Sequence, residues 1–233
     1  MARALRVGLA LVARREWRGQ ANLPLTGPAL IVANHLSSLD PAFVGEFIAY
    51  SGRWPYFLAK DSLFRWPVIG FFVRRSGMIP VHRGTDHVAD ALDEAQRYLD
   101  EGHVVVLYPE GTTARDPLLW PCRPRTGAAR LALATGLPVI PLGQWGVSTI
   151  CPDNAGPQRT PHLLPRHDVV LELGEPVTTL RGDPSDPADV EAAGEVIMAA
   201  VTAIVERLRG EPMPAGRWDP KRHERVVPVP GPR

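Results

Sequence analysis

The chain has 233 residues, of which 45% are hydrophobic, and a formal net charge of +1. The hydrophobic content suffices for one domain with short appendages, and the near-neutral charge argues against a nucleic-acid-binding protein. Cys122 and Cys151 form neither a disulfide framework nor a metal-ligand pattern, which is typical of a reducing compartment. No stretch reaches the roughly 20 apolar residues that span a bilayer, and we expect no signal peptide.

Residues 1–18 predict a short basic helix with Leu5, Leu9 and Val12 on one stripe. One interpretation is that residues 1–20 form an interfacial helix attracted to anionic lipid, with Trp17 near its end. The alternative is a helix that packs on its own domain. A second apolar stripe leaves both interpretations open. The arginines around this helix are Arg3, Arg6, Arg14, Arg15 and Arg18.

From residue 29 the sequence alternates between strand-like and helix-like segments. Strands are predicted at 29–33, 56–59, 78–81, 103–107, 138–142 and 168–173. Helices are predicted at 41–50, 67–75, 86–101, 125–135 and 187–208. Continuous apolar runs such as 104–107 indicate strands that are covered on both faces. The fold class is therefore α/β, a single layered domain over 21–210 with a mostly parallel or mixed central sheet flanked by helices.

Two segments break this alternation. Residues 151–167 carry several prolines without a period and predict an extended loop. Residues 211–233 are rich in proline and are expected to be extended or disordered.

The segment Asn34–Asp40 carries the strongest chemical signal. A histidine oriented by a carboxylate is a common general base near neutral pH. Residues five apart point in different directions within one helix, so His35 and Asp40 meet only if His35 lies in the loop after the strand. Asp40 precedes Pro41 and predicts a helix start, where one carboxylate oxygen caps the helix and the other holds the ring.

Two other strand ends carry candidate binding residues. At Tyr108–Thr112, Gly111 lets backbone N–H groups approach a substrate, and Glu110 can accept hydrogen bonds from hydroxyls. After the strand at 78–81, Arg83 can clamp a phosphate; His82 is a weaker candidate base, with no carboxylate at comparable spacing before Asp86. Each feature alone also fits an ordinary turn or a solvated arginine. Together they describe transfer to a hydroxyl on a phosphorylated acceptor.

These segments resemble the four ordered motifs of the glycerolipid acyltransferases, in particular the 1-acyl-glycerol-3-phosphate acyltransferases. The motifs are Asn34 to Asp40, Gly77 to Arg83, Tyr108 to Thr112 and Val139 to Leu142, and the similarity spans roughly residues 25–180. The chain departs from the family in two places. His82 replaces the usual Asp before the second-motif arginine, and Thr113 stands where Arg usually follows Glu-Gly-Thr. Either Arg115 supplies the missing charge or the acceptor head group differs.

The resemblance implies an O-acyltransferase that moves an acyl group from acyl-CoA or acyl carrier protein to a lysophospholipid hydroxyl, with no cofactor and no metal. His35 and Asp40 are then catalytic, with backbone N–H groups near Gly111 as candidate oxyanion donors. The expected location of the protein is the cytoplasmic face of the cell membrane, to which it would bind peripherally. The expected substrate-binding residues are Arg83, Glu110, Gly111, Thr112, Arg115 and Lys60.

Three alternatives remain at this stage. They are transfer to another lysophospholipid or glycolipid acceptor, hydrolysis of a thioester, and lipid binding without catalysis. Additional aromatic residues are candidates either for membrane contact or for the core: Phe64, Trp66, Phe71 and Phe72.

Overall fold

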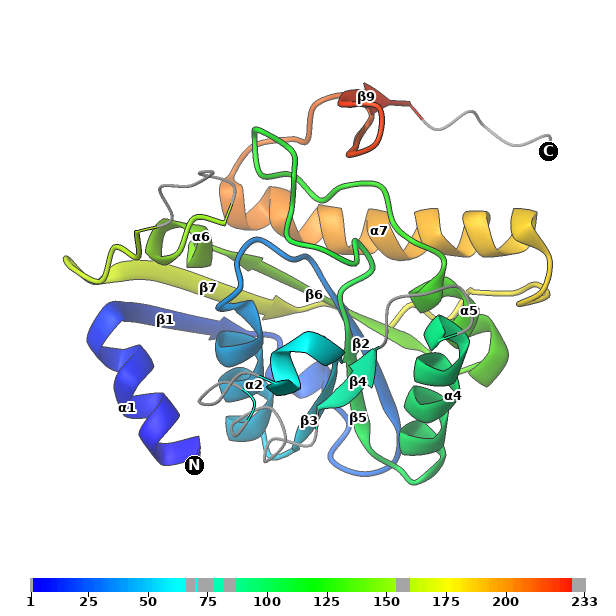
Figure 1. The fold of residues 1–233 in the computed structure, drawn as a ribbon, viewed down its shortest axis with the longest axis horizontal. Helices are drawn as coiled ribbons and strands as arrows, with labels where there is room; N and C mark the ends of the chain where they lie inside the picture. Colours follow the sequence, from blue (N-terminus) through cyan, green and yellow to red (C-terminus); the bar gives the residue numbers. More distant parts are fainter. Residues whose placement is uncertain (1, 66–69, 71–77, 82–86, 154–159, 228–233) are drawn as a thin grey trace.

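The computed structural model describes residues 2–65, 70, 78–81, 87–153 and 160–227. Its centre is a seven-stranded sheet with the strand order β1-β7-β6-β2-β5-β3-β4 (Figure 1). All neighbouring strands are parallel except β6 and β7, which are antiparallel. The prediction of a mixed central sheet is therefore confirmed. The strands are β1 (Ala13–Arg18), β2 (Ala29–Ala33), β3 (Pro55–Lys60), β4 (Ile79–Val81), β5 (Val104–Leu107), β6 (Val139–Trp145) and β7 (His167–Leu173).

Helices cover both faces of this sheet, and consecutive residues of β2 show how. Ile31 packs into the core that includes α1, α2 and α6, whereas Leu30 and Val32 pack into the core that includes α4, α5 and α7. This division follows from the alternation of side chains along a strand. It explains why the two central strands β2 and β5 contain no polar residues. The helices are α1 (Ala2–Val12), α2 (Asp40–Tyr50), α4 (His87–Asp100), α5 (Gly127–Thr135), α6 (Val147–Ile150) and α7 (Pro187–Arg209), with short 3-10 turns η1 (Gln20–Asn22) and η2 (Asp61–Arg65).

The N-terminal segment differs from the prediction of a single helix over 1–18. The helix α1 ends at Val12, and the next six residues form β1, which pairs in parallel with β7 at the edge of the sheet. Trp17 packs edge-on against Phe47 of α2, with ring centroids 5.5 Å apart, and therefore faces the protein. Leu9 is also buried in the core, while Val7 and Leu11 are exposed. No described helix is both long enough and apolar enough to cross a membrane.

The C-terminal segment also differs from its prediction. Residues 211–227 are ordered around a two-stranded antiparallel sheet of β8 (Arg217–Asp219) and β9 (Glu224–Val226). Buried Arg217 donates to Thr202 Oγ1 of α7 at 2.7 Å, and Arg225 pairs with buried Asp116. These polar contacts fasten the segment together with the packing of Trp218 against the apolar cluster of Leu36, Ala114 and Cys122. The helix predicted at 67–75 lies almost entirely outside the described residues.

Candidate active site

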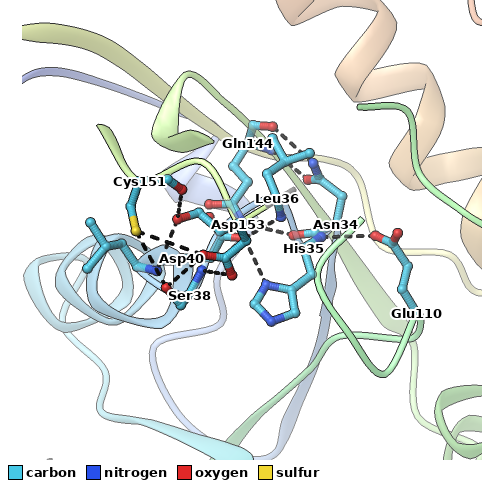
Figure 2. A network of polar contacts seen from close by, with 11 residues as sticks. Asn34, His35, Leu36, Ser38, Asp40, Glu110, Gln144, Cys151 and Asp153 are labelled. Carbon is cyan, nitrogen blue, oxygen red and sulfur yellow. Dashed lines mark hydrogen bonds and ion pairs between the residues drawn. The ribbon is translucent and has the colours of Figure 1, made fainter. Parts of the chain in front are cut away.

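His35 and Asp40 meet in the loop between β2 and α2 (Figure 2). The His35 Nδ1 atom lies 2.9 Å from Asp40 Oδ2, and the same oxygen accepts the N–H groups of Leu36 at 2.5 Å and Ser37 at 2.9 Å. The loop thus curls around one carboxylate oxygen. The predicted helix-capping role is wrong, because α2 begins at Asp40 itself, Leu39 before it has helical backbone angles and no side chain caps the helix.

The Asp40 carboxylate is fully buried, and this burial raises its pKa. The hydrogen bonds from His35 and from the two backbone N–H groups act in the opposite direction and favour the ionised form. With a proton on Nδ1 directed at Asp40, the lone pair of Nε2 is the basic position of the imidazole. The His35 side chain keeps 16% of its surface exposed. The geometry is therefore that of a general base with an accessible nitrogen.

Tyr108 stacks on the imidazole, a role that no sequence pattern indicated. The ring centroids of His35 and Tyr108 are 4.2 Å apart and the planes differ by 20°. Tyr108 also stacks on Phe57 of β3 at 6.2 Å. Burial, with a smaller effect of the Asp40 charge, raises the pKa of Tyr108 well above its usual range, so the phenol stays neutral. The imidazole is thus fixed by Asp40 at its edge and by an aromatic ring on its face.

Glu110 is buried and contacts backbone, not a substrate hydroxyl as predicted. Its Oε1 accepts the N–H of His35 at 3.0 Å, and its Oε2 accepts the N–H of Cys122 at 2.9 Å. Burial raises the pKa of Glu110 to about 7. Because both oxygens are already engaged by backbone donors, we assign Glu110 the task of positioning His35 and the segment around Cys122.

The turn after Glu110 contacts the backbone of His35. Gly111 has a φ of +66°, a left-handed conformation that favours glycine, and its N–H donates to Tyr108 O at 3.0 Å. Ala114 N donates to His35 O at 2.6 Å. The half-buried Thr112 forms no hydrogen bond to any described residue. Arg115, which follows Ala114, is exposed.

The remaining predicted binding residues lie on β3 and beyond β4. Lys60 ends β3, which runs parallel to β5 and so ends at the same edge of the sheet as the segment that carries Tyr108. Arg83, which follows β4, lies outside the described residues, as does the alternative base His82. The topology brings the ends of β2, β5 and β3 to one edge, as expected for a ligand site in an open parallel sheet.

Two polar contacts that the sequence did not reveal hold the His35 loop in place. Asn34 and Gln144 of β6 are fully buried and exchange three hydrogen bonds of 2.7–3.0 Å. On the other side, the Asp153 carboxylate accepts the N–H of Ser38 at 2.8 Å and its hydroxyl at 3.0 Å (Figure 2). A buried amide pair and a loop carboxylate carry no distinctive spacing, so only the fold reveals them.

Two serines and one cysteine near His35 that could act as covalent nucleophiles are engaged or inactive. Ser37 Oγ donates to Cys151 O at 2.8 Å, and the Ser38 hydroxyl donates to Asp153. Burial raises the pKa of the Cys122 thiol to about 12, which removes its thiolate at neutral pH. The site is therefore suited to direct attack by a substrate hydroxyl that His35 deprotonates.

Comparisons with known proteins agree with this geometry. A 1-acyl-sn-glycerol-3-phosphate acyltransferase from Brassica napus chloroplasts is 29% identical over 172 residues, which cover 73% of this chain and 47% of the relative. A 1-acyl-sn-glycerol-3-phosphate acyltransferase of Borreliella burgdorferi is 31% identical over 128 residues, covering 53% of this chain and 48% of the relative. An N-acylphosphatidylethanolamine synthase of Arabidopsis thaliana is 29% identical over 161 residues, covering 64% and 56%. The chain thus spans about half the length of these curated relatives.

The fold has a counterpart among solved structures. The crystal structure of the 1-acyl-sn-glycerophosphate acyltransferase from Thermotoga maritima superimposes with a TM-score of 0.65 at 22% identity, covering 91% of this chain and 81% of that one. The profile of the family described as Acyltransferase matches residues 14–145, more than half of the chain, and includes the His35 loop and the Glu110 turn. The chain belongs to this acyltransferase family.

Proposed function

We propose that this protein transfers a fatty acyl group from acyl-CoA or acyl carrier protein to the hydroxyl of a lysophospholipid, most favourably 1-acyl-glycerol-3-phosphate. The observation that carries the proposal is the His35–Asp40 pair, with Nδ1 held at 2.9 Å and the imidazole partly exposed at the sheet edge. The relatives named as 1-acyl-sn-glycerol-3-phosphate acyltransferases support this choice of acceptor.

In this reaction His35 Nε2 takes the proton of the acceptor hydroxyl while its oxygen attacks the thioester carbonyl. The thioester C–S bond then breaks, an ester C–O bond remains, and the departing thiolate receives the proton from the imidazolium. Asp40 holds the tautomer and stabilises the imidazolium, and general-base catalysis of this kind contributes ~10²–10⁴-fold. The N–H groups of Thr112 and Thr113, unbonded among the described residues, are candidate donors to the oxyanion.

The acceptor phosphate requires cations beside this base. We assign this role to Arg83, Arg115 and Lys60, of which Arg115 is exposed next to the turn that binds the His35 carbonyl. Because the substrates are amphiphilic, we further propose peripheral contact with the cytoplasmic face of the membrane. The exposed Val7 and Leu11 on the basic helix α1 support that contact.

A panel assay tests the proposal. The full chain is given oleoyl-CoA and, separately, oleoyl-lysophosphatidate, lysophosphatidylethanolamine, lysophosphatidylcholine and glycerol 3-phosphate, and the ester product is measured. We expect the highest kcat/KM with lysophosphatidate and loss of turnover in His35→Ala, with an unchanged unfolding transition. Release of free oleate alone in the presence of every acceptor would identify a hydrolase instead. Lipid binding with no product of either kind would identify a non-catalytic protein.

One observation favours a second acceptor class. The chain differs from its family at His82 and Thr113, and one relative is named an N-acylphosphatidylethanolamine synthase. An ethanolamine head group presents an amine rather than a phosphomonoester. Formation of an N-acyl amide from lysophosphatidylethanolamine in the same panel, with release of the thiol of the donor, would select this acceptor.

A further inference from the structure

The glycine of the Glu-Gly-Thr turn leaves room for an arginine that is distant in sequence. A Cβ added to Gly111 would lie 2.6 Å from Cδ and 2.8 Å from Nε of Arg125, closer than side-chain contacts allow. The guanidinium carbon of Arg125 would be 3.4 Å away. The side chain of Arg125 therefore passes directly over the backbone of Gly111 and occupies the space that a side chain at position 111 would take.

Two hydrogen bonds from backbone N–H groups place the segment that carries Arg125. The Arg125 N–H donates to Pro109 O at 2.8 Å, and three residues earlier Cys122 N donates to Glu110 Oε2. The segment 122–125 therefore lies along the turn 109–111, the same turn whose Glu110 binds the N–H of His35. The guanidinium of Arg125 consequently borders the turn that positions the candidate base.

This guanidinium has no anionic partner among the described residues, although it is exposed beside the site. Many other arginines of the chain are paired with carboxylates, for example Arg123 with Glu191 and Arg217 with Glu195. A guanidinium whose backbone is fixed beside the site and which is left unpaired among the described residues is suited to bind an external oxyanion, since it can donate two parallel hydrogen bonds.

We propose that Arg125 binds the phosphate of the acceptor and that the absence of a side chain at Gly111 leaves room for this arginine. The inference rests on the proposed function and deepens it. It supplies a guanidinium at the Glu-Gly-Thr turn of a chain that has Thr113 in the following position. The acceptor chemistry it fits is a phosphate group, such as that of a lysophosphatidate.

The first test compares Arg125→Gln with Arg130→Gln. Arg130 is a suitable control because it is also exposed, lies on the neighbouring helix α5 and has no carboxylate partner among the described residues. With oleoyl-CoA and oleoyl-lysophosphatidate, we expect Arg125→Gln to raise the acceptor KM about 10- to 100-fold, the range for a lost charge-assisted hydrogen bond. The KM for oleoyl-CoA should stay within about twofold, and Arg130→Gln should leave both values unchanged.

The second test uses Gly111→Ala, whose added methyl group displaces Arg125. We expect a raised acceptor KM, to which the strain of alanine at a positive φ also contributes, and adding Arg125→Gln to Gly111→Ala should raise that KM no further, because the interaction is already lost. Far-ultraviolet circular dichroism and thermal unfolding establish that each variant is folded.

The outcomes are separable. Absence of acyl transfer by the unmodified chain would overturn the proposed function itself. Transfer by the unmodified chain, with an unchanged acceptor KM in folded Arg125→Gln, would overturn the phosphate role of Arg125 alone. Multiplicative effects of the two single variants would overturn the link between Gly111 and Arg125.

Discussion

Substitution of Asp40 separates the charge of its carboxylate from its hydrogen-bonding geometry. One oxygen, Oδ2, accepts all three hydrogen bonds, while Oδ1 has no partner in the described structure. In Asp40→Asn the amide oxygen can occupy the Oδ2 position and keep the three contacts, but the negative charge is lost. In Asp40→Ala the imidazole and two backbone N–H groups lose their acceptor.

The two variants should therefore differ in stability but not in activity. Loss of the charge that stabilises the imidazolium should lower kcat by ~10²–10⁴-fold in both. Burial raises the pKa of Asp40 in the folded protein, so the protonated carboxyl group favours the fold. This contribution to the free energy of unfolding is complete below the pKa of an unfolded Asp and is lost as the pH rises through the pKa of the folded protein. At pH 8 Asp40→Asn, which removes the buried charge but places its NH2 at the unpartnered Oδ1 position, should thus be more stable than Asp40→Ala. Asp40→Ala should lose ~1–3 kcal/mol for each buried donor left unpaired.

Urea unfolding at pH 8 and steady-state acyl transfer measure the two quantities. The reasoning fails if Asp40→Asn retains full activity, because the carboxylate charge would then be dispensable. It also fails if Asp40→Asn is as destabilised as Asp40→Ala, because the amide would then not preserve the contacts of Oδ2.

Three further variants test other parts of the structure. Arg15→Ala leaves the buried carboxylate of Glu46 unpaired and should cost ~3–5 kcal/mol in urea unfolding. Arg14→Ala, whose ion pair is exposed, should leave the free energy of unfolding almost unchanged; equal losses would refute the difference in burial. Tyr108→Leu removes the ring stacked on the imidazole and should lower kcat by the factor that corresponds to ~0.5–1.5 kcal/mol, whereas Tyr108→Phe should keep kcat. Identical kcat values for the two variants would show that the stacked ring does not contribute to catalysis. Burial raises the pKa of Glu110 from 4.5 to about 7, so its protonated form favours the fold. The free energy of unfolding, compared with that of Glu110→Gln, should therefore fall as the pH rises over this range and then level off. A rise would contradict the burial of Glu110.

The sequence was sufficient for the buried centre of the fold. The strand at 29–33 and the helices near 41–50 and 187–208 form almost where predicted, because continuous apolar runs and helical periods reflect burial directly. At the edges the same reasoning failed. The segment Ala13–Arg18 carries three arginines and one glutamate, and it becomes a strand only because β7, distant in sequence, offers an edge.

The site shows a similar division. The spacing of His35 and Asp40 predicted their meeting, since the chemistry lies within one loop. The inward direction of Glu110 and the approach of Arg125 to Gly111 depend on how distant segments pack, and no local pattern contains that information. Tyr108 lies within one of the predicted motifs. Its stacking on His35, however, depends on the pairing of β2 with β5, because His35 follows β2 and Tyr108 follows β5.

The C-terminal hairpin affects the order in which the site can be completed during synthesis. Asp116 pairs with Arg225, and Arg123 N donates to Trp218 O at 3.0 Å, so the segment between Glu110 and Arg125 is fastened by residues about a hundred positions later. On the ribosome, the His35 loop and its turn emerge long before these partners exist. A nascent chain can therefore assemble the base early, but the segment between Glu110 and Arg125 is fastened only after residues 217–226 have been synthesised.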